Sequence, residues 1–155
     1  MRLVLDTSAI VCLVEREFGW EVAKARMASS SEVSISALTV VEFIKRCLAR
    51  GENEAQAQKS ADEMISLVHE VIPTDQAIAN LVLTISVHAT SRVPTVDSII
   101  AATAIQHGAV LLHRDAHFRG IPQTMLHQEE LPAPNSGEAP NSINAPSSIK
   151  AKEGT

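Results

Sequence analysis

Short apolar segments alternate along this chain with longer segments that have helical hydrophobic spacing. Short apolar segments favour buried β-strands, and apolar side chains at i, i+3, i+4 and i+7 indicate amphipathic helices. Strands joined by helices form a parallel sheet with right-handed crossovers. We therefore predict an α/β domain, a three-layer α/β/α sandwich with a central parallel sheet. The predicted strands cover residues 2–5, 32–36, 69–74, 109–112 and, as a last edge strand, 123–127.

Five helices are predicted between these strands. The first begins at the capping residues Thr7 and Ser8, and the last begins at the N-cap residue Thr95 and ends at Gly108. The last helix is apolar nearly all round, so we expect it to be buried. The apolar positions of the other three helices lie within residues 40–48, 61–68 and 78–85.

Length and composition favour one globular domain, which we place at residues 1–130 of the 155. Residues 131–155 are rich in Pro, Ser and Asn and hold few large apolar side chains, so we expect a disordered tail. The sequence has neither an apolar run long enough to span a membrane nor a secretory signal before Asp6, so we expect a cytoplasmic protein without membrane contact. Cys12 and Cys47 lack the spacing of a metal site, and we interpret both as core thiols.

Four acidic residues are placed by this topology at one edge of the sheet. Asp6 and Asp115 directly follow apolar strands, whereas Glu42 and Asp97 lie in the first turns of helices that begin at the same edge. Each also has a structural explanation. Asp6 can cap the first helix and Asp115 can begin a turn, while Thr39 and Glu42 match a capping box and Asp97 suits a helix dipole. Capping alone does not explain four acids at one edge.

Carboxylates crowded together raise one another's pKa values, and a divalent cation removes this cost. Oxygen ligands without thiolates suit Mg²⁺ or Mn²⁺, and four carboxylates are compatible with one ion or two. Such ions can activate water and neutralise a phosphoryl oxygen, so the site predicts phosphodiester hydrolysis. The net charge of −5 makes the chain a poor nonspecific binder of nucleic acid unless bound metal offsets part of it.

The motifs around these acids resemble those of the PIN-domain family, and within it the VapC-like ribonuclease toxins of bacterial toxin–antitoxin pairs. The resemblance covers about residues 1–130 and rests on four motifs taken together. They are VLDTS at 4–8, SALTVVE at 36–42, VDSIIAA at 96–102 and LLHRDAHF at 111–118.

This resemblance implies endonucleolytic cleavage of RNA, often structured RNA such as tRNA. It also implies a homodimer and inhibition by a cognate antitoxin. The implied metal ligands are four acids with two supporting hydroxyls nearby, namely Asp6, Glu42, Asp97 and Asp115 with Ser8 and Thr39.

Two histidines depart from the family's pattern. The last motif commonly has Thr or Ser two residues before its acid and a further Asp two residues after it, where this chain has His113 and His117. The missing acid leaves a second metal position short of one ligand. If residues 113–117 are extended, both imidazoles and the Asp115 carboxylate point to one side and favour Mn²⁺ or another transition metal over Mg²⁺. The alternative is that both histidines are solvated or hydrogen-bonded.

Three arginines near the acidic edge, Arg92, Arg114 and Arg119, are candidates for binding RNA phosphate, although solvated surface arginines would look the same. With few aromatic residues there is no stacking platform for single-stranded bases, so substrate choice rests on RNA shape. Two other classes of protein stay open. A phosphoaspartate-forming phosphatase would want a second acid where Ser8 stands, and a non-catalytic PIN-like or receiver-like domain would only bind a partner.

Overall fold

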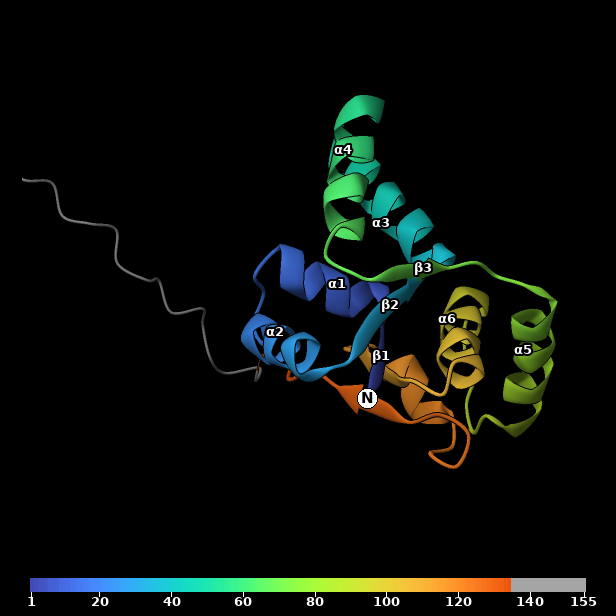
Figure 1. Cartoon of the computed structure of the whole chain (residues 1–155). Coiled ribbons are helices and arrows are strands. Elements are labelled where there is room, and N and C mark those ends of the chain that lie inside the picture. Colours follow the sequence, from blue (N-terminus) through green and yellow to red (C-terminus); the bar gives the residue numbers. More distant parts are fainter. Residues whose placement is uncertain (135–155) are drawn as a thin grey trace, which may run out of the picture.

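The structure, a computed structural model, describes residues 1–134, so most of the predicted tail lies outside the described residues. A five-stranded sheet forms the middle layer, and every neighbouring pair of its strands is parallel (Figure 1). The predicted three-layer α/β/α sandwich is therefore confirmed. In spatial order the strands are β3 (Glu70–Ile72), β2 (Glu32–Ser36), β1 (Arg2–Leu5), β4 (Val110–His113) and β5 (Gln128–Glu130).

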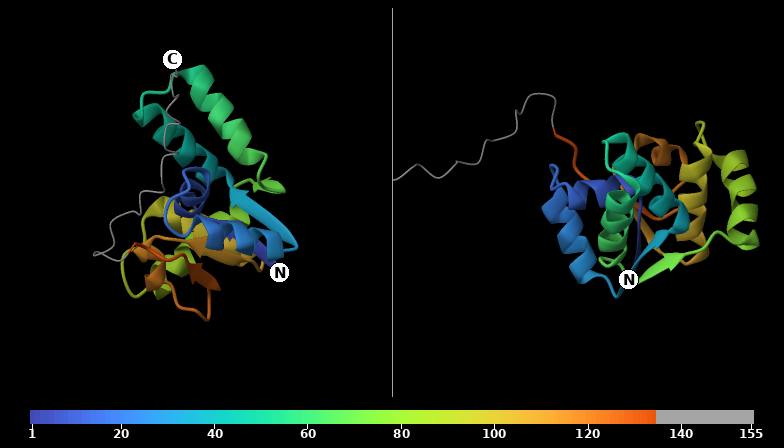
Figure 2. Two further views of the ribbon diagram at one scale, coloured as in Figure 1. Left: turned by 90° about the vertical axis from the view of Figure 1, so that its left-hand side faces the viewer. Right: turned by 90° about the horizontal axis from the view of Figure 1, so that it is seen from above.

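Helices cover both faces of the sheet, as the views in Figure 2 show. Side chains alternate across β1, so Leu3 and Leu5 pack in one core and Val4 packs in the other. The first core is closed by α1 (Thr7–Val14), α2 (Trp20–Ser29), α3 (Ala37–Ala49) and α4 (Glu54–Ile65). The second is closed by α5 (Gln76–His88), α6 (Thr95–Gln106) and the short 3₁₀ helix η1 (Ala116–Gly120).

The connections of the sheet diverge between β1 and β4. The chain leaves β1 through α1 and α2 on one face, whereas it reaches β4 through α5 and α6 on the other. Leu5 is paired with Leu112, and the Asp6 N–H donates to the Leu112 carbonyl at 3.0 Å, so both strands end at the same level. Ligand sites of open parallel sheets lie at such a divergence, beyond the carboxyl ends of the strands.

The predicted edge strand at 123–127 is wrong. Residues 123–125 form a turn after Pro122, whose carbonyl accepts from the Met125 and Leu126 N–H groups. The true edge strand, β5, consists of Gln128, Glu129 and Glu130, and a hydrophobic pattern cannot identify so polar a strand.

Two capping predictions are also corrected. Pro94, not Thr95, is the N-cap of α6, and Thr95 is its first helical residue. At α1 the cap is Asp6, whose side chain accepts from the Ser8 N–H. Helix α2 and η1 were not predicted. In α2 only Ala23 is fully buried, and the face that packs against the first core is narrow, consisting of Trp20, Ala23 and Met27. The five residues of η1 are too few to show a hydrophobic period.

Two expectations about the core hold within residues 1–134. Six of the twelve residues of α6 are buried and only its two end residues are exposed, and both cysteines are buried free thiols. None of the helices in this part of the chain is long and apolar enough to cross a membrane. Leu131 is buried in the first core, and its N–H donates to the His113 carbonyl at 2.7 Å, so ordered packing continues to the start of the predicted tail.

Candidate metal centre

The four predicted acids line one pocket at the divergence between β1 and β4. The pocket has a volume of about 610 Å³. Asp6 follows β1 and Asp115 follows β4, while Glu42 comes from α3 and Asp97 from the first turn of α6. Side chains from all three layers of the fold therefore meet at this pocket.

Asp6 is the most buried of these acids, with 4% of its surface exposed. Burial raises the pKa of its carboxyl above the ordinary value, although hydrogen bonds from Ser8 oppose this effect. Both the N–H and the hydroxyl of Ser8 donate to Asp6 Oδ2. The Ser8 hydroxyl oxygen also accepts from the Arg114 N–H at 2.8 Å, so Ser8 connects the end of β1 to the segment after β4.

Glu42 is held by Thr7 and takes no part in a capping box. The Thr7 hydroxyl donates to Glu42 Oε2, and Ser36 caps α3 by accepting from the Leu38 N–H at 3.3 Å. Thr39 is buried, and its hydroxyl has no hydrogen-bond partner within residues 1–134. The hydroxyl that orients Glu42 thus belongs to Thr7. Sequence reasoning missed it, although its position next to Asp6 placed it at the same edge.

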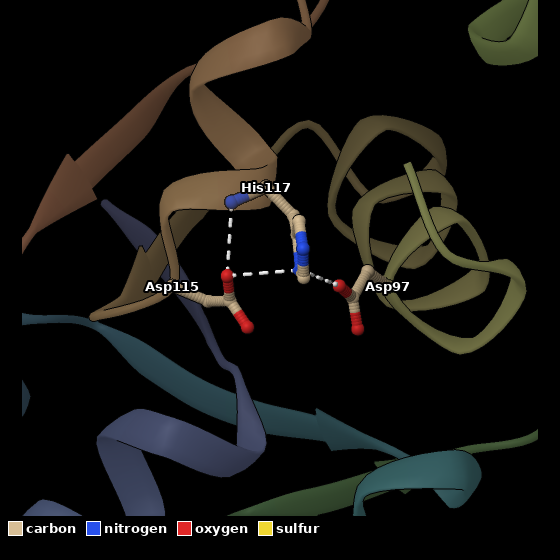
Figure 3. A group of neighbouring side chains, drawn as sticks. All are labelled: Asp97, Asp115 and His117. Atoms are coloured by element: carbon tan, nitrogen blue, oxygen red, sulfur yellow. Dashed lines mark hydrogen bonds and ion pairs between the residues drawn. The ribbon is translucent and has the colours of Figure 1, made fainter. Parts of the chain in front are cut away.

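Asp97, Asp115 and His117 form a compact group in this pocket region (Figure 3). His117 Nδ1 lies 3.1 Å from Asp97 Oδ2 and 3.0 Å from Asp115 Oδ1. One candidate ligand atom from each residue lies within 4.8 Å of the others. Asp115 also caps η1, where its Oδ1 accepts from the His117 N–H at 2.9 Å.

The pKa of Asp97 reflects its burial and the crowding of charges around it. Burial, followed by the nearby charges of Asp115 and Asp6, raises the pKa of Asp97 from 3.8 to about 6. His117 lowers that pKa and Glu42 raises it further. A divalent cation would remove the repulsion, and carboxylate oxygens are its usual ligands, so the residues present fit Mg²⁺ or Mn²⁺.

His113 does not join this group. The chain turns into η1 after Asp115, so the extended arrangement that would put both imidazoles on one side does not form. His113 has 1% of its surface exposed, and its ring packs against that of Phe118 with centroids 4.8 Å apart. Burial lowers the pKa of His113, which favours the neutral ring.

The three arginines predicted for RNA differ in their surroundings. Arg114 lines the pocket, but its guanidinium donates to Glu17 Oε2 at 2.6 Å and to the Phe18 carbonyl, so it holds the loop between α1 and α2. Arg119 is mostly exposed and pairs with Glu130. Arg92 is exposed just before α6.

A fourth arginine, Arg46, lines the same pocket and was missed from the sequence. It follows Glu42 by four residues in α3, and residues at this spacing share one helix face. Its guanidinium forms two hydrogen bonds with Glu15, at 3.0 and 3.1 Å. Arg46 and Arg50 hold the pKa of Glu15 below its ordinary value.

Comparisons with known proteins agree with this fold. A family profile described as the PIN domain matches residues 3–123. No curated protein matches the sequence significantly. Among solved structures, VapBC2 of Rickettsia felis, bound to a DNA fragment from its promoter, is 18% identical with a TM-score of 0.69, over 85% of this chain and 100% of that chain.

Two further structures are similar. FitAcB of Neisseria gonorrhoeae is 25% identical with a TM-score of 0.60, over 76% of this chain and 91% of that chain. VapC20 of Mycobacterium tuberculosis, described as a sarcin–ricin loop cleaving toxin, is 19% identical with a TM-score of 0.59, over 78% of this chain and 97% of that chain.

Proposed function

The chain belongs to the PIN domain family, and we propose that it is a metal-dependent endoribonuclease, the toxin of a toxin–antitoxin pair. The observation that carries the proposal is the meeting of four carboxylates from separate parts of the chain at one pocket. VapC20, described as a sarcin–ricin loop cleaving toxin, and a further similar structure described as a toxin–antitoxin complex support the toxin role. The assigned catalytic and metal-binding residues are Asp6, Glu42, Asp97 and Asp115.

The ion that these acids would hold is Mg²⁺ or Mn²⁺. When bound there, it supplies an activated water for attack on phosphorus and neutralises a phosphoryl oxygen. The protein's contribution is to fix the ligands in advance. Ser8 orients Asp6 through two hydrogen bonds, and Thr7 orients Glu42 through one. Thr39 stays a candidate supporting residue, although its hydroxyl makes no hydrogen bond to an acid among the described residues.

RNA phosphate needs a cation from the protein, because the chain as a whole is acidic. We assign this role first to Arg46, whose guanidinium is at the pocket and is partly exposed. Arg92 and Arg119 stay candidates for contacts farther along the RNA, whereas the internal bonds of Arg114 favour a structural role. We propose structured RNA, such as tRNA, as the substrate class.

The same proposal includes a cognate antitoxin protein, a homodimer and a cytoplasmic location, where its RNA substrates are found. Residues 1–130 would form the nuclease domain. The alternative is a PIN-like domain that binds a partner without catalysis, or a receiver-like domain. A non-catalytic PIN-like domain would have no need of four carboxylates around one pocket, since their repulsion destabilises the metal-free protein. A receiver domain typically pairs two adjacent acids near its first strand, where this chain has Asp6 followed by Thr7.

The test is to incubate the purified protein with total RNA and with tRNA, in Mg²⁺, in Mn²⁺ and in excess chelator. Asp97→Asn is the disabling variant. Asp62→Asn is its matched control, because Asp62 is exposed on α4 outside the pocket. We expect metal-dependent cleavage by the wild type and by Asp62→Asn, and none by Asp97→Asn. Cleavage that persists in Asp97→Asn, or no cleavage by the wild type in either metal, would refute the proposal.

A further inference from the structure

The candidate metal centre contains an imidazole as well as carboxylates. Figure 3 shows the His117 ring between the Asp97 and Asp115 carboxylates, with its Nδ1 directed toward an oxygen of each. No other histidine in residues 1–134 joins a group of this kind. The candidate centre therefore offers a nitrogen donor as well as oxygen donors, which differs chemically from four acids alone.

The distances in this group fit ligands of one ion. Two ligands at right angles, each about 2.1 Å from an octahedral ion, are roughly 3 Å apart. The Nδ1 atom of His117 lies 3.1 Å from Asp97 Oδ2 and 3.0 Å from Asp115 Oδ1, and the set stays within 4.8 Å. A single cation could replace the hydrogen bonds that join these atoms without a large movement of the side chains.

The backbone also fixes this arrangement. Asp115 caps η1 by accepting from the His117 N–H, so the acid and the imidazole are set by the same turn. Asp97 reaches them from α6, which is packed in the second core. Asp97 is therefore held by α6, whereas Asp115 and His117 are held by η1.

We propose that His117 supplies a nitrogen ligand to the ion held by Asp97 and Asp115, so that the site binds Mn²⁺ or a related transition-metal ion in preference to Mg²⁺. This inference rests on the proposed metal-dependent function and specifies the class of ion that the site would bind. Imidazole suits first-row transition metals, whereas Mg²⁺ takes oxygen ligands and keeps several waters. The metal would bind the lone pair of Nδ1, leaving the ring proton on Nε2.

The experiment measures metal binding to the full-length protein in the absence of RNA. Calorimetric titrations give the affinities for Mn²⁺ and Mg²⁺ in the wild type and in His117→Asp and His117→Asn. His127→Asp is the matched control, because His127 is exposed in the loop before β5 and lies outside the pocket. We expect the ratio of Mn²⁺ to Mg²⁺ affinity to fall at least about tenfold in both His117 variants and to be unchanged in His127→Asp.

Pulsed electron paramagnetic resonance on the Mn²⁺-loaded wild type gives a second readout that does not depend on a variant. A directly bound imidazole nitrogen would produce a ¹⁴N hyperfine coupling that is absent from His117→Asn. An equal affinity ratio in wild type and variants, or no nitrogen coupling in the wild type, would overturn the inference while metal-dependent cleavage persisted. Failure of the wild type to bind either ion would overturn the proposed function as well.

Discussion

Replacing Asp97 with Asn should stabilise the metal-free protein while removing its response to metal. In the folded protein the pKa of Asp97 is raised from 3.8 to about 6, first by burial and then by the charges of Asp115 and Asp6. Each tenfold change in proton affinity corresponds to about 1.4 kcal/mol, so ionisation of Asp97 at pH 8 costs the folded state at most about 3 kcal/mol. Because water partly screens these charges, we expect roughly 1 to 3 kcal/mol of stabilisation.

The sign of the pH dependence follows from the raised pKa. The folded protein binds the Asp97 proton more tightly than the unfolded chain does, so this carboxyl lowers stability progressively as pH rises from about 4 to about 6. Above that range the cost is constant. The advantage of Asp97→Asn should therefore be largest at pH 8 and should disappear near pH 4.

The assay is thermal unfolding in chelator at pH 8 and at lower pH, followed by the same scans in millimolar Mn²⁺ or Mg²⁺. For a chain of this length, about 1 kcal/mol moves the Tm by roughly 3 °C, so Asp97→Asn should melt roughly 3 to 9 °C above the wild type in chelator at pH 8. Added metal should raise the Tm of the wild type much more than that of the variant. Asp62→Asn should follow the wild type throughout. A lower Tm for Asp97→Asn in chelator at pH 8 would refute the electrostatic reasoning.

Three further variants separate contacts with RNA from contacts within the fold. Arg46→Ala should raise the KM for RNA about tenfold, and Arg46→Lys should recover part of the affinity. Stability should fall by less than about 1 kcal/mol, because Glu15 keeps a second arginine partner. An unchanged KM would remove Arg46 from the substrate site. Arg114→Ala should lower the Tm, because its partly buried guanidinium holds the loop between α1 and α2, and a Tm equal to that of the wild type would contradict that role. Gly120→Ala should destabilise the protein by no more than about 1 kcal/mol, because the Ser91 hydroxyl that a Cβ there would overlap ends a short, exposed side chain that can change rotamer, and urea unfolding would measure it.

The layers of the fold and the four acids could be predicted because both depend on strong patterns. Apolar runs ended directly at Asp6 and close to Asp115, and the rule that parallel strands end at one edge was sufficient to bring distant residues together. Elements without a hydrophobic pattern could not be predicted from the sequence. Strand β5 is made of Gln128, Glu129 and Glu130, and its place in the sheet depends on pairing with β4.

The finer parts of the site depend on contacts between distant segments. The motif at residues 36–42 points to Thr39 as a supporting hydroxyl, whereas the hydroxyl that reaches Glu42 belongs to Thr7. Similarly, nothing in the sequence distinguishes His113 from His117. In the structure, the chain turns after Asp115, so the His113 ring lies in the core and the His117 ring lies among the acids. Which of these side chains reaches the site depends on tertiary packing, and local sequence patterns do not predict it.

The four acids of the pocket come from all three layers of the sandwich, so a bound cation would restrict how these layers move relative to one another. Asp6 and Asp115 are fixed to adjacent strands, whereas Glu42 and Asp97 come from helices on opposite sides of the sheet. A bound cation would cross-link these three bodies, so metal loading should slow amide hydrogen exchange in α3 and α6 together. Any partner that separates α3 from α6 would disable the centre without touching a single ligand.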